Sequence, residues 1–160
     1  MFSNTTEYAL RAIVNIATNR DRAVTAADIA KATKVPQSYL SKVLLDLVSA
    51  GIVVSQRGPN GGFSLARPPE NISVLDVVNA VDPIRRIEVC PLGIPSHGKD
   101  LCRLHRRLDD AIAMVEESLK NSSISEMCSA SKSGTRCLFP TLTVAGKAPV
   151  KKQRAGEKDE

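Results

Sequence analysis

The stretch from Val35 to Pro68 constrains the fold more than any other part of this 160-residue chain. It begins with apolar residues that recur at the helical period, and Pro36 suits the first helical turn because its missing N–H would be unpaired there. Gly51 can adopt the left-handed conformation that ends a helix. Two short runs, residues 52–54 and 63–65, then predict paired β-strands. The apolar stripe of the helix is Leu40, Val43, Leu44, Leu47 and Val48.

The loop between the two expected strands is rich in glycine and carries a cation at its base. Its residues are Arg57, Gly58, Pro59, Asn60, Gly61 and Gly62. These residue types are typical of tight turns. A helix that leads directly into a hairpin with a basic tip indicates a winged helix-turn-helix. We therefore predict a mainly α fold with a small β-hairpin wing.

Three further helices complete the expected domain, residues 1–82. The first starts at Asn4, which with Glu7 makes a capping-box pair. The second opens at Thr25, and the turn after it leads into the helix at Pro36, which is the helix-turn-helix arrangement. After the wing, Ser73 and Asp76 cap another helix. The residues expected to face inward or to make apolar contacts in these three helices are Ala9, Ala12, Ile13, Ile16, Ala17, Ala26, Ile29, Ala30, Val74, Val77, Val78 and Val81.

Composition excludes several classes of protein. No apolar run approaches the roughly 20 residues of a membrane span, and the first residues lack the order of a signal peptide, so we expect a cytoplasmic protein without membrane contact. Residues 1–82 hold 8 basic and 7 acidic side chains, whereas residues 129–160 hold 7 and 3, so the net charge of +5 is mostly a property of the tail. DNA binding must therefore be argued from individual cations. No nucleophile–base arrangement or phosphate-binding loop indicates an enzyme.

A long helix is expected from about Leu101 to near Asn121. Its apolar residues alternate steps of three and four, the seam of a coiled coil, and one such helix on a small domain needs a partner. We assign residues 83–103 to a sensor loop, 104–128 to the dimerisation helix and its end, and 129–160 to a disordered basic tail. The seam is Leu101, Leu104, Leu108, Ala111 and Val115, widened by Ile112 and Leu119.

Several motifs, in the same order along the chain, resemble those of the Rrf2 family of bacterial transcription regulators. They are TEYALRA at residues 6–12, Ser38-Tyr39-Leu40, RGPNGGFSLAR at 57–67 and VLDVVNAVD at 74–82. The resemblance covers about residues 1–120. It implies a homodimer that binds a pseudo-palindromic double-stranded DNA operator, with the Pro36 helix in the major groove and the wing in the minor groove. The candidate DNA-binding residues are Gln37, Ser38, Tyr39, Ser41, Lys42, Arg57, Gly58, Pro59, Asn60 and Gly61.

Family members that bind iron–sulfur clusters carry three closely spaced cysteines in the sensor loop. This chain has Cys90 and Cys102 but no middle cysteine, and His97 stands near the missing position. His105, one turn after Cys102, can point the same way. Glu7 stands where some relatives offer an acidic ligand from the other subunit.

Three interpretations of this region stay open. The first is an iron–sulfur cluster, for which two thiolates, an imidazole and a carboxylate suit the two-iron form. The second is a metal-free loop with oxidisable thiols. The third is zinc held by the two cysteines and two histidines. We treat Cys128 and Cys137 as incidental thiols.

The expected function is that of a dimeric, sequence-specific transcriptional repressor that senses iron, nitric oxide or redox state through residues 90–105. The alternatives are a metal-free regulator controlled by a protein partner and a zinc-stabilised regulator. The sequence does not identify the operator or the signal.

Overall fold

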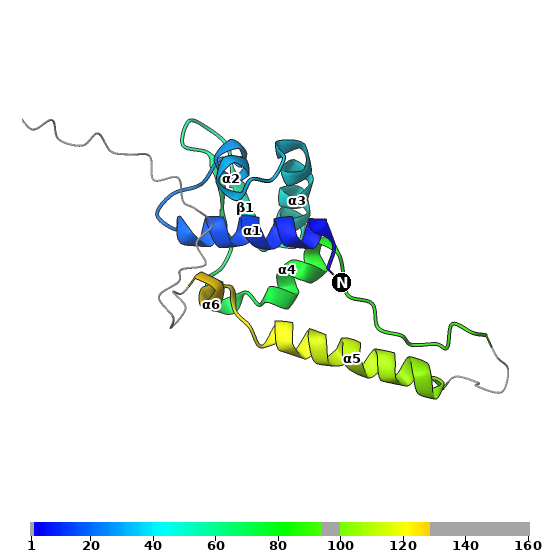
Figure 1. Cartoon of the computed structure of the whole chain (residues 1–160). Helices are drawn as coiled ribbons and strands as arrows, with labels where there is room; N and C mark the ends of the chain where they lie inside the picture. Colours follow the sequence, from blue (N-terminus) through cyan, green and yellow to red (C-terminus); the bar gives the residue numbers. More distant parts are fainter. Residues whose placement is uncertain (1, 94–99, 129–160) are drawn as a thin grey trace, which may run out of the picture.

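In the computed structural model, residues 2–93 and 100–128 are described, and they form a mostly helical domain with one antiparallel hairpin. Figure 1 shows α1 crossing beneath α2 and α3, with α4 and α6 against its other side and α5 farther out. This arrangement confirms the predicted winged helix-turn-helix class. The elements are α1 (Asn4–Thr18), α2 (Ala26–Thr33), α3 (Gln37–Ser49), β1 (Val53–Gln56), β2 (Gly62–Leu65), the 3-10 helix η1 (Pro69–Asn71), α4 (Val74–Val81), α5 (Arg103–Lys120) and α6 (Ile124–Cys128).

The core forms where the apolar stripes of α1, α3 and α4 meet. Each stripe recurs at the helical period, so one face of each helix is removed from water while the other stays solvated. All five residues expected on the buried face of α1 are buried, and on α3 only Val48 of the predicted stripe is partly exposed. On α4, Val81 is likewise only partly buried, because the helix ends there.

Helix capping confirms two expectations and corrects one. The Thr25 hydroxyl accepts a hydrogen bond from the Asp28 N–H, and Ser73 and Asp76 form a complete capping box. The predicted Asn4–Glu7 pair is wrong, because Ser3 is the N-cap residue of α1 and its hydroxyl accepts from the Thr6 N–H. The Glu7 carboxylate instead pairs with Arg11, one turn along α1.

The turn between α2 and α3 depends on a residue in the left-handed conformation. Lys34, at the end of α2, has φ +57°, a region that L-residues other than Asn and Asp adopt rarely. Beyond α3, Gly51 takes φ +67° and ends the helix as predicted. Both strands extend beyond the predicted runs at the loop end, and Ile52 lies before β1 although it is buried.

The long helix α5 begins at Arg103, two residues later than expected, and leads to α6. In α6, Ile124 is fully buried, and its N–H donates to the Ile72 carbonyl at 2.9 Å. Residues 104–128, expected as one helix and its end, therefore hold two helices. No helix formed by residues 2–93 and 100–128 has the length and hydropathy needed to cross a membrane.

Candidate functional site

The outward face of α3 carries the side chains predicted to contact DNA. Gln37, Ser38, Tyr39, Ser41 and Lys42 are all exposed. They are exposed because the apolar stripe turns the opposite face of the helix into the core. The first two turns of α3 therefore present hydroxyl, amide, phenol and ammonium groups together.

Two side chains on this face have local contacts that affect what they can donate. The Ser41 hydroxyl donates to the Gln37 carbonyl at 3.0 Å, so its oxygen remains able to accept a hydrogen bond from outside. Tyr39 is 65% exposed, and its ring meets the Tyr8 ring edge-on with centroids 6.5 Å apart. This contact restrains the Tyr39 ring while most of the side chain stays exposed.

The wing is a two-stranded antiparallel hairpin whose tip is closed by a tight turn. Gln56 pairs with Gly62, and within the tip the Gly61 N–H donates to the Gly58 carbonyl at 2.9 Å. A Cβ on Gly61 would lie 2.5 Å from the Gln56 carbonyl oxygen, so only glycine fits there. Pro59 sets the turn, and Arg57 and Asn60, both exposed, carry the polar side chains of the tip.

A β-bridge ties the wing to the helix-turn-helix. Val24, just before α2, exchanges two backbone hydrogen bonds with Phe63 of β2, at 2.9 and 2.8 Å. Val24 is itself buried in the core. The wing therefore does not depend on its two strands alone, because β2 is also attached to the segment that precedes α2.

A second candidate site brings together Cys90, Cys102 and His105. Their ligand atoms all lie within 4.8 Å of one another. The His105 Nδ1 atom is 3.5 Å from the Cys90 Sγ and 3.2 Å from the Cys102 Sγ. Cys90 is buried, whereas Cys102 and His105 are partly exposed at the start of α5. Three of the predicted ligands are thus close in space although they come from two segments of the chain.

The remaining predicted ligands do not join this group among the described residues. His97 lies outside the described residues, as do Cys137 and the tail at 129–160. Glu7 of the same chain pairs with Arg11 and is not part of the group. Cys128 lies apart on α6, where burial raises the pKa of its thiol, opposed by a hydrogen bond from Thr18 and the charge of Arg20.

The geometry of the group fits a bound metal. With metal–sulfur and metal–nitrogen bonds of about 2.3 and 2.05 Å at tetrahedral angles, a nitrogen and a sulfur on one metal ion lie about 3.5 Å apart. The distance of 3.5 Å from Nδ1 to the Cys90 sulfur equals this value, and the distance of 3.2 Å to the Cys102 sulfur is somewhat shorter. Thiolate and imidazole are ligands of zinc and of iron–sulfur clusters alike. The described residues therefore supply three of the four protein ligands that either group needs.

Arg86 fastens the segment that carries Cys90 to α5. Its Nε and Nη2 atoms each donate to the Asp109 carboxylate at 2.6 Å, and its Nη1 donates to Glu116 at 3.4 Å. The Ile87 N–H adds a bond to Asp109 at 2.9 Å. The Arg86 hydrogen bonds, helped by that of Ile87, lower the pKa of Asp109 from 3.8 to about 2. Asp109 in turn raises the pKa of Arg86.

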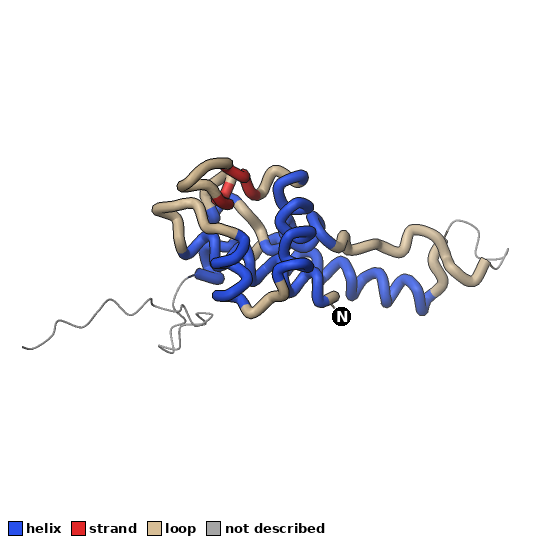
Figure 2. The backbone as a smooth tube through the Cα atoms, turned by 90° about the horizontal axis from the view of Figure 1, so that it is seen from above, coloured by secondary structure: helices blue, strands red, loops and turns tan. Residues whose placement is uncertain are grey.

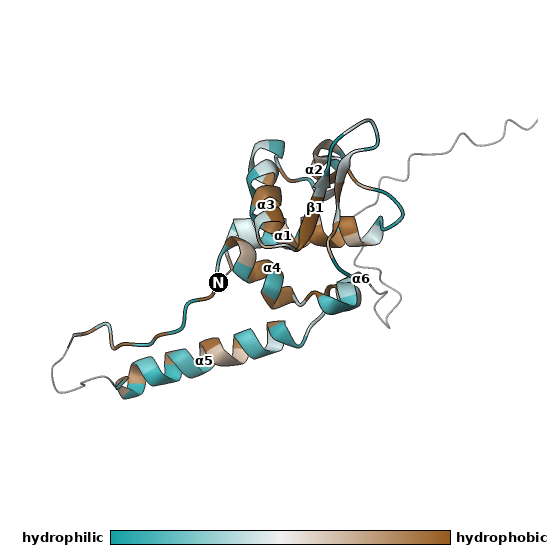
Figure 3. Cartoon of the chain, turned by 180° about the vertical axis from the view of Figure 1, so that it is seen from behind, coloured by the Kyte–Doolittle hydropathy of each residue, from teal (hydrophilic) through white to brown (hydrophobic). Residues whose placement is uncertain are grey.

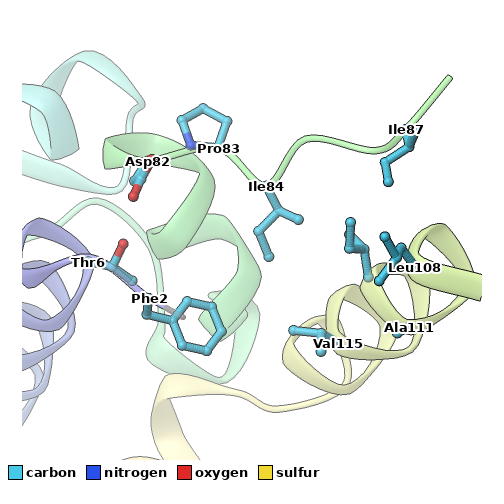
Figure 4. Close-up of a pocket in the computed structure, with 10 residues that line it drawn as sticks. Phe2, Thr6, Asp82, Pro83, Ile84, Ile87, Leu108, Ala111 and Val115 are labelled. Atoms are coloured by element: carbon cyan, nitrogen blue, oxygen red, sulfur yellow. The ribbon is translucent and has the colours of Figure 1, made fainter. Parts of the chain in front are cut away.

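Helix α5 buries none of its residues within the chain. Leu104 and Met114 are 62% and 73% exposed, and Figure 3 shows an apolar band midway along an otherwise hydrophilic helix. Between α5 and the N-terminus of α1 lies an open cavity of about 610 Å³. Figure 4 shows Phe2, Ile84 and Leu108 around this cavity. An apolar cavity beside an exposed helix leaves hydrophobic surface that the described residues do not cover.

Comparison with known proteins identifies the family. The family model Rrf2, described as an iron-dependent transcriptional regulator, matches residues 2–130. The chain belongs to the Rrf2 family. A protein of Aquifex aeolicus (strain VF5), described as an HTH-type transcriptional regulator, is 33% identical over 130 residues, which are 79% of this chain and 90% of that protein.

Solved Rrf2 structures share the fold. CymR of B. subtilis, the global cysteine regulator, matches with a TM-score of 0.66 and 26% identity over 82% of this chain and 98% of CymR. IscR of T. potens also gives a TM-score of 0.66, with 23% identity over 79% of this chain and 85% of IscR, which supports the shared fold. The protein is therefore a transcriptional regulator of the Rrf2 family, and the prediction that it is not an enzyme is confirmed.

Sequence reasoning missed two features of this Rrf2 protein. Leu45 is 65% exposed on α3, on the same face as Ser38 and Lys42, and its position seven residues after Ser38 could have revealed it. The Arg86–Asp109 pair spans 23 residues and has no local signature.

Proposed function

We propose that this Rrf2 protein is a homodimeric repressor that binds a pseudo-palindromic operator and responds to a signal at Cys90, Cys102 and His105. The proposal depends mainly on one observation. The polar face of α3 is exposed, and the wing is joined to the same helix-turn-helix domain through the bridge between Val24 and Phe63. This arrangement suits simultaneous contact with two adjacent grooves of duplex DNA.

The chemistry of the α3 face supports direct reading of bases. Gln37 can bond adenine through its amide, and Ser38 and Ser41 can meet base edges or phosphates. Lys42 can neutralise a phosphate. Leu45, which shares this face, offers an apolar contact for a thymine methyl group. At the wing, Arg57 suits a narrow minor groove, where the potential is most negative.

The exposed apolar residues of α5 support dimerisation. No residue of this 18-residue helix is fully buried within its own chain, so a partner would add the apolar packing from which helices in proteins gain most of their stability. A second copy of α5 would cover Leu104, Leu108 and Val115, and the cavity beside them gives the partner more apolar surface to cover. A two-fold dimer of this kind matches a palindromic operator by symmetry.

The thiol–imidazole group supports a sensing role. Cys90, Cys102 and His105 would hold the metal, with a fourth ligand from outside the described part of the chain, such as His97, or from the partner's Glu7. A two-iron cluster tolerates imidazole in place of thiolate and would supply redox and nitric-oxide chemistry. Zinc, or a metal-free pair of oxidisable thiols, suits the same three residues.

DNA binding is tested with duplexes selected from a random library by the purified protein. Arg57→Ala should weaken binding by about 1–3 kcal/mol per protomer and reduce its salt dependence. Arg107→Ala removes an equally exposed arginine from α5 and is the matched control. If both variants bind like the wild type, the wing does not contact DNA, and a winged helix that docks on a protein becomes the better explanation.

The signal is tested on protein purified without oxygen. The absorption spectrum is recorded while iron, sulfide and zinc are quantified on the same sample. Equal iron and sulfide with charge-transfer bands would support a cluster, stoichiometric zinc would support a structural site, and neither would leave a thiol switch. If Cys90→Ala and Cys102→Ala bind the operator like wild type under oxidising and reducing conditions, the sensing proposal is wrong.

A further inference from the structure

The three residues of the thiol–imidazole group differ in how firmly the fold holds them. Cys102 is the N-cap residue of α5 and His105 lies in its first turn, so both are fixed by a regular helix. Cys90 lies on the segment after α4, where residues 83–93 form neither helix nor strand. The approach of Cys90 to the other two therefore depends on whatever fastens this segment to α5.

The contacts that fasten this segment to α5 lie four residues away from the thiol–imidazole group, both on the segment and on α5. Asp109 follows His105 by four residues, so the two side chains lie on the same face of α5. Arg86 precedes Cys90 by four residues on the segment that runs beside α5 in Figure 2. The two-pronged bond between Arg86 and Asp109 fixes direction as well as distance, because a guanidinium and a carboxylate are both planar.

Apolar packing does not fix the segment equally well. Ile84 packs against the core at the start of the segment, but farther along Ile87 and Leu108 line an open cavity of about 610 Å³ (Figure 4). Loose apolar contacts allow a segment to slide, since they have no preferred direction. Among the described residues, the ion pairs between this segment and α5 are those that Arg86 makes with Asp109 and Glu116.

We propose that Arg86, through its bonds to Asp109, is the positioning residue that keeps the Cys90 thiol within ligand distance of Cys102 and His105. The idea deepens the proposed function, since it rests on these three residues acting as the sensor. It also assigns roles to two residues far from the DNA-binding face. Residues that orient the ligands of a metal site typically change metal affinity by 10- to 100-fold when they are replaced.

The first experiment measures how close the two thiols are without any metal. The full chain carrying Cys128→Ser and Cys137→Ser is equilibrated with glutathione buffers and a chelator. Oxidised glutathione takes two electrons from the two thiols, which leaves one Cys90–Cys102 disulfide and two molecules of reduced glutathione. The equilibrium constant gives the effective concentration of one thiol at the other.

Arg86→Gln should lower that effective concentration at least about tenfold, and Asp109→Asn should do the same. Combining the two should cause a loss smaller than the sum of the single losses, because both remove the Arg86–Asp109 bonds, whereas only Arg86 contacts Glu116 and only Asp109 accepts from the Ile87 N–H. Arg86→Lys should recover part of the lost effective concentration. The control is Arg85→Gln, which removes a neighbouring exposed arginine and should leave the value unchanged. An Arg86→Gln value within twofold of the control would overturn the proposal.

The second experiment follows binding of Co²⁺ by its thiolate charge-transfer absorption. In Arg86→Gln, Cys102 and His105 remain together on α5, while the segment that carries Cys90 loses its ion pairs to the helix. The absorption per bound ion should therefore fall to about half that of a two-thiolate site, and the apparent Kd should rise about tenfold or more. Full absorption per ion in this variant would contradict the proposed role, because both thiols would still bind.

The proposal and the proposed function fail separately. Neither experiment uses DNA, so loss of thiol proximity in Arg86→Gln supports the positioning role even if Cys90→Ala has no effect on operator binding. If the wild type does not bind Co²⁺, the glutathione equilibrium alone decides between the two outcomes.

Discussion

Replacing Ile124 tests whether the short helix α6 is part of the DNA-binding domain's core. Ile124 is fully buried. Ile124→Ala removes three carbon atoms, worth about 2.4 kcal/mol in transfer free energy, and the cavity left behind adds to this loss. We expect the free energy of unfolding to fall by about 3 kcal/mol.

The assay is thermal unfolding followed by circular dichroism, at one fixed protomer concentration because a dimer's stability depends on concentration. A loss of about 3 kcal/mol should lower the Tm by roughly 10 °C for a folded region of this size. Ile124→Val provides a milder change of about 1 kcal/mol should the alanine variant fail to fold.

Met127→Ala is the matched control, since Met127 lies on the same helix and is 44% exposed. It should change stability by less than about 0.5 kcal/mol. If Ile124→Ala and Met127→Ala unfold at the same temperature, α6 contributes nothing to the core and the reasoning is refuted.

Three further changes probe other parts of the fold. Lys34→Asn should raise the free energy of unfolding by about 1 kcal/mol in urea titrations, because asparagine tolerates φ +57° better; a loss of stability would show that Lys34 is not strained. Gly62→Ala should cost about 1–3 kcal/mol, since its Cβ would lie 2.6 Å from the Val24 carbonyl oxygen, and retained wild-type stability would contradict that contact. The lowered pKa of Asp109 means that its contribution to stability is present above pH 3.8 and is lost as the pH falls toward about 2. Asp109→Asn should therefore make the free energy of unfolding depend less on pH between these values. An unchanged slope would disprove this linkage.

The DNA-binding half of the fold was predictable because its signals are local. The stripe on α3, the turn residues of the wing and the Ser73–Asp76 cap all act within a few neighbouring residues. The N-cap of α1 was mispredicted because Ser3 and Asn4 are both good capping residues one position apart, and Glu7 pairs with Arg11 instead.

The sensor half was less predictable because its contacts are distant in sequence. The proximity of Cys90 to His105 spans 15 residues, and the Arg86–Asp109 pair spans 23. The ligand types indicated a site, but no pattern could show which residues hold the segment in place. Helix α6 escaped notice because five residues are too few to display a helical period.

The attachment of α5 at both ends has a mechanical consequence. The Arg86 cluster and the Cys90 group hold its N-terminal half to the segment that leaves α4, and α6 holds its C-terminal end to α1 through the core. A helix that is attached at both ends passes a rotation of one end on to the elements that hold it. A change in the position of the start of α5 would therefore reach α4 through the Arg86 cluster and α1 through α6, without passing through a second subunit.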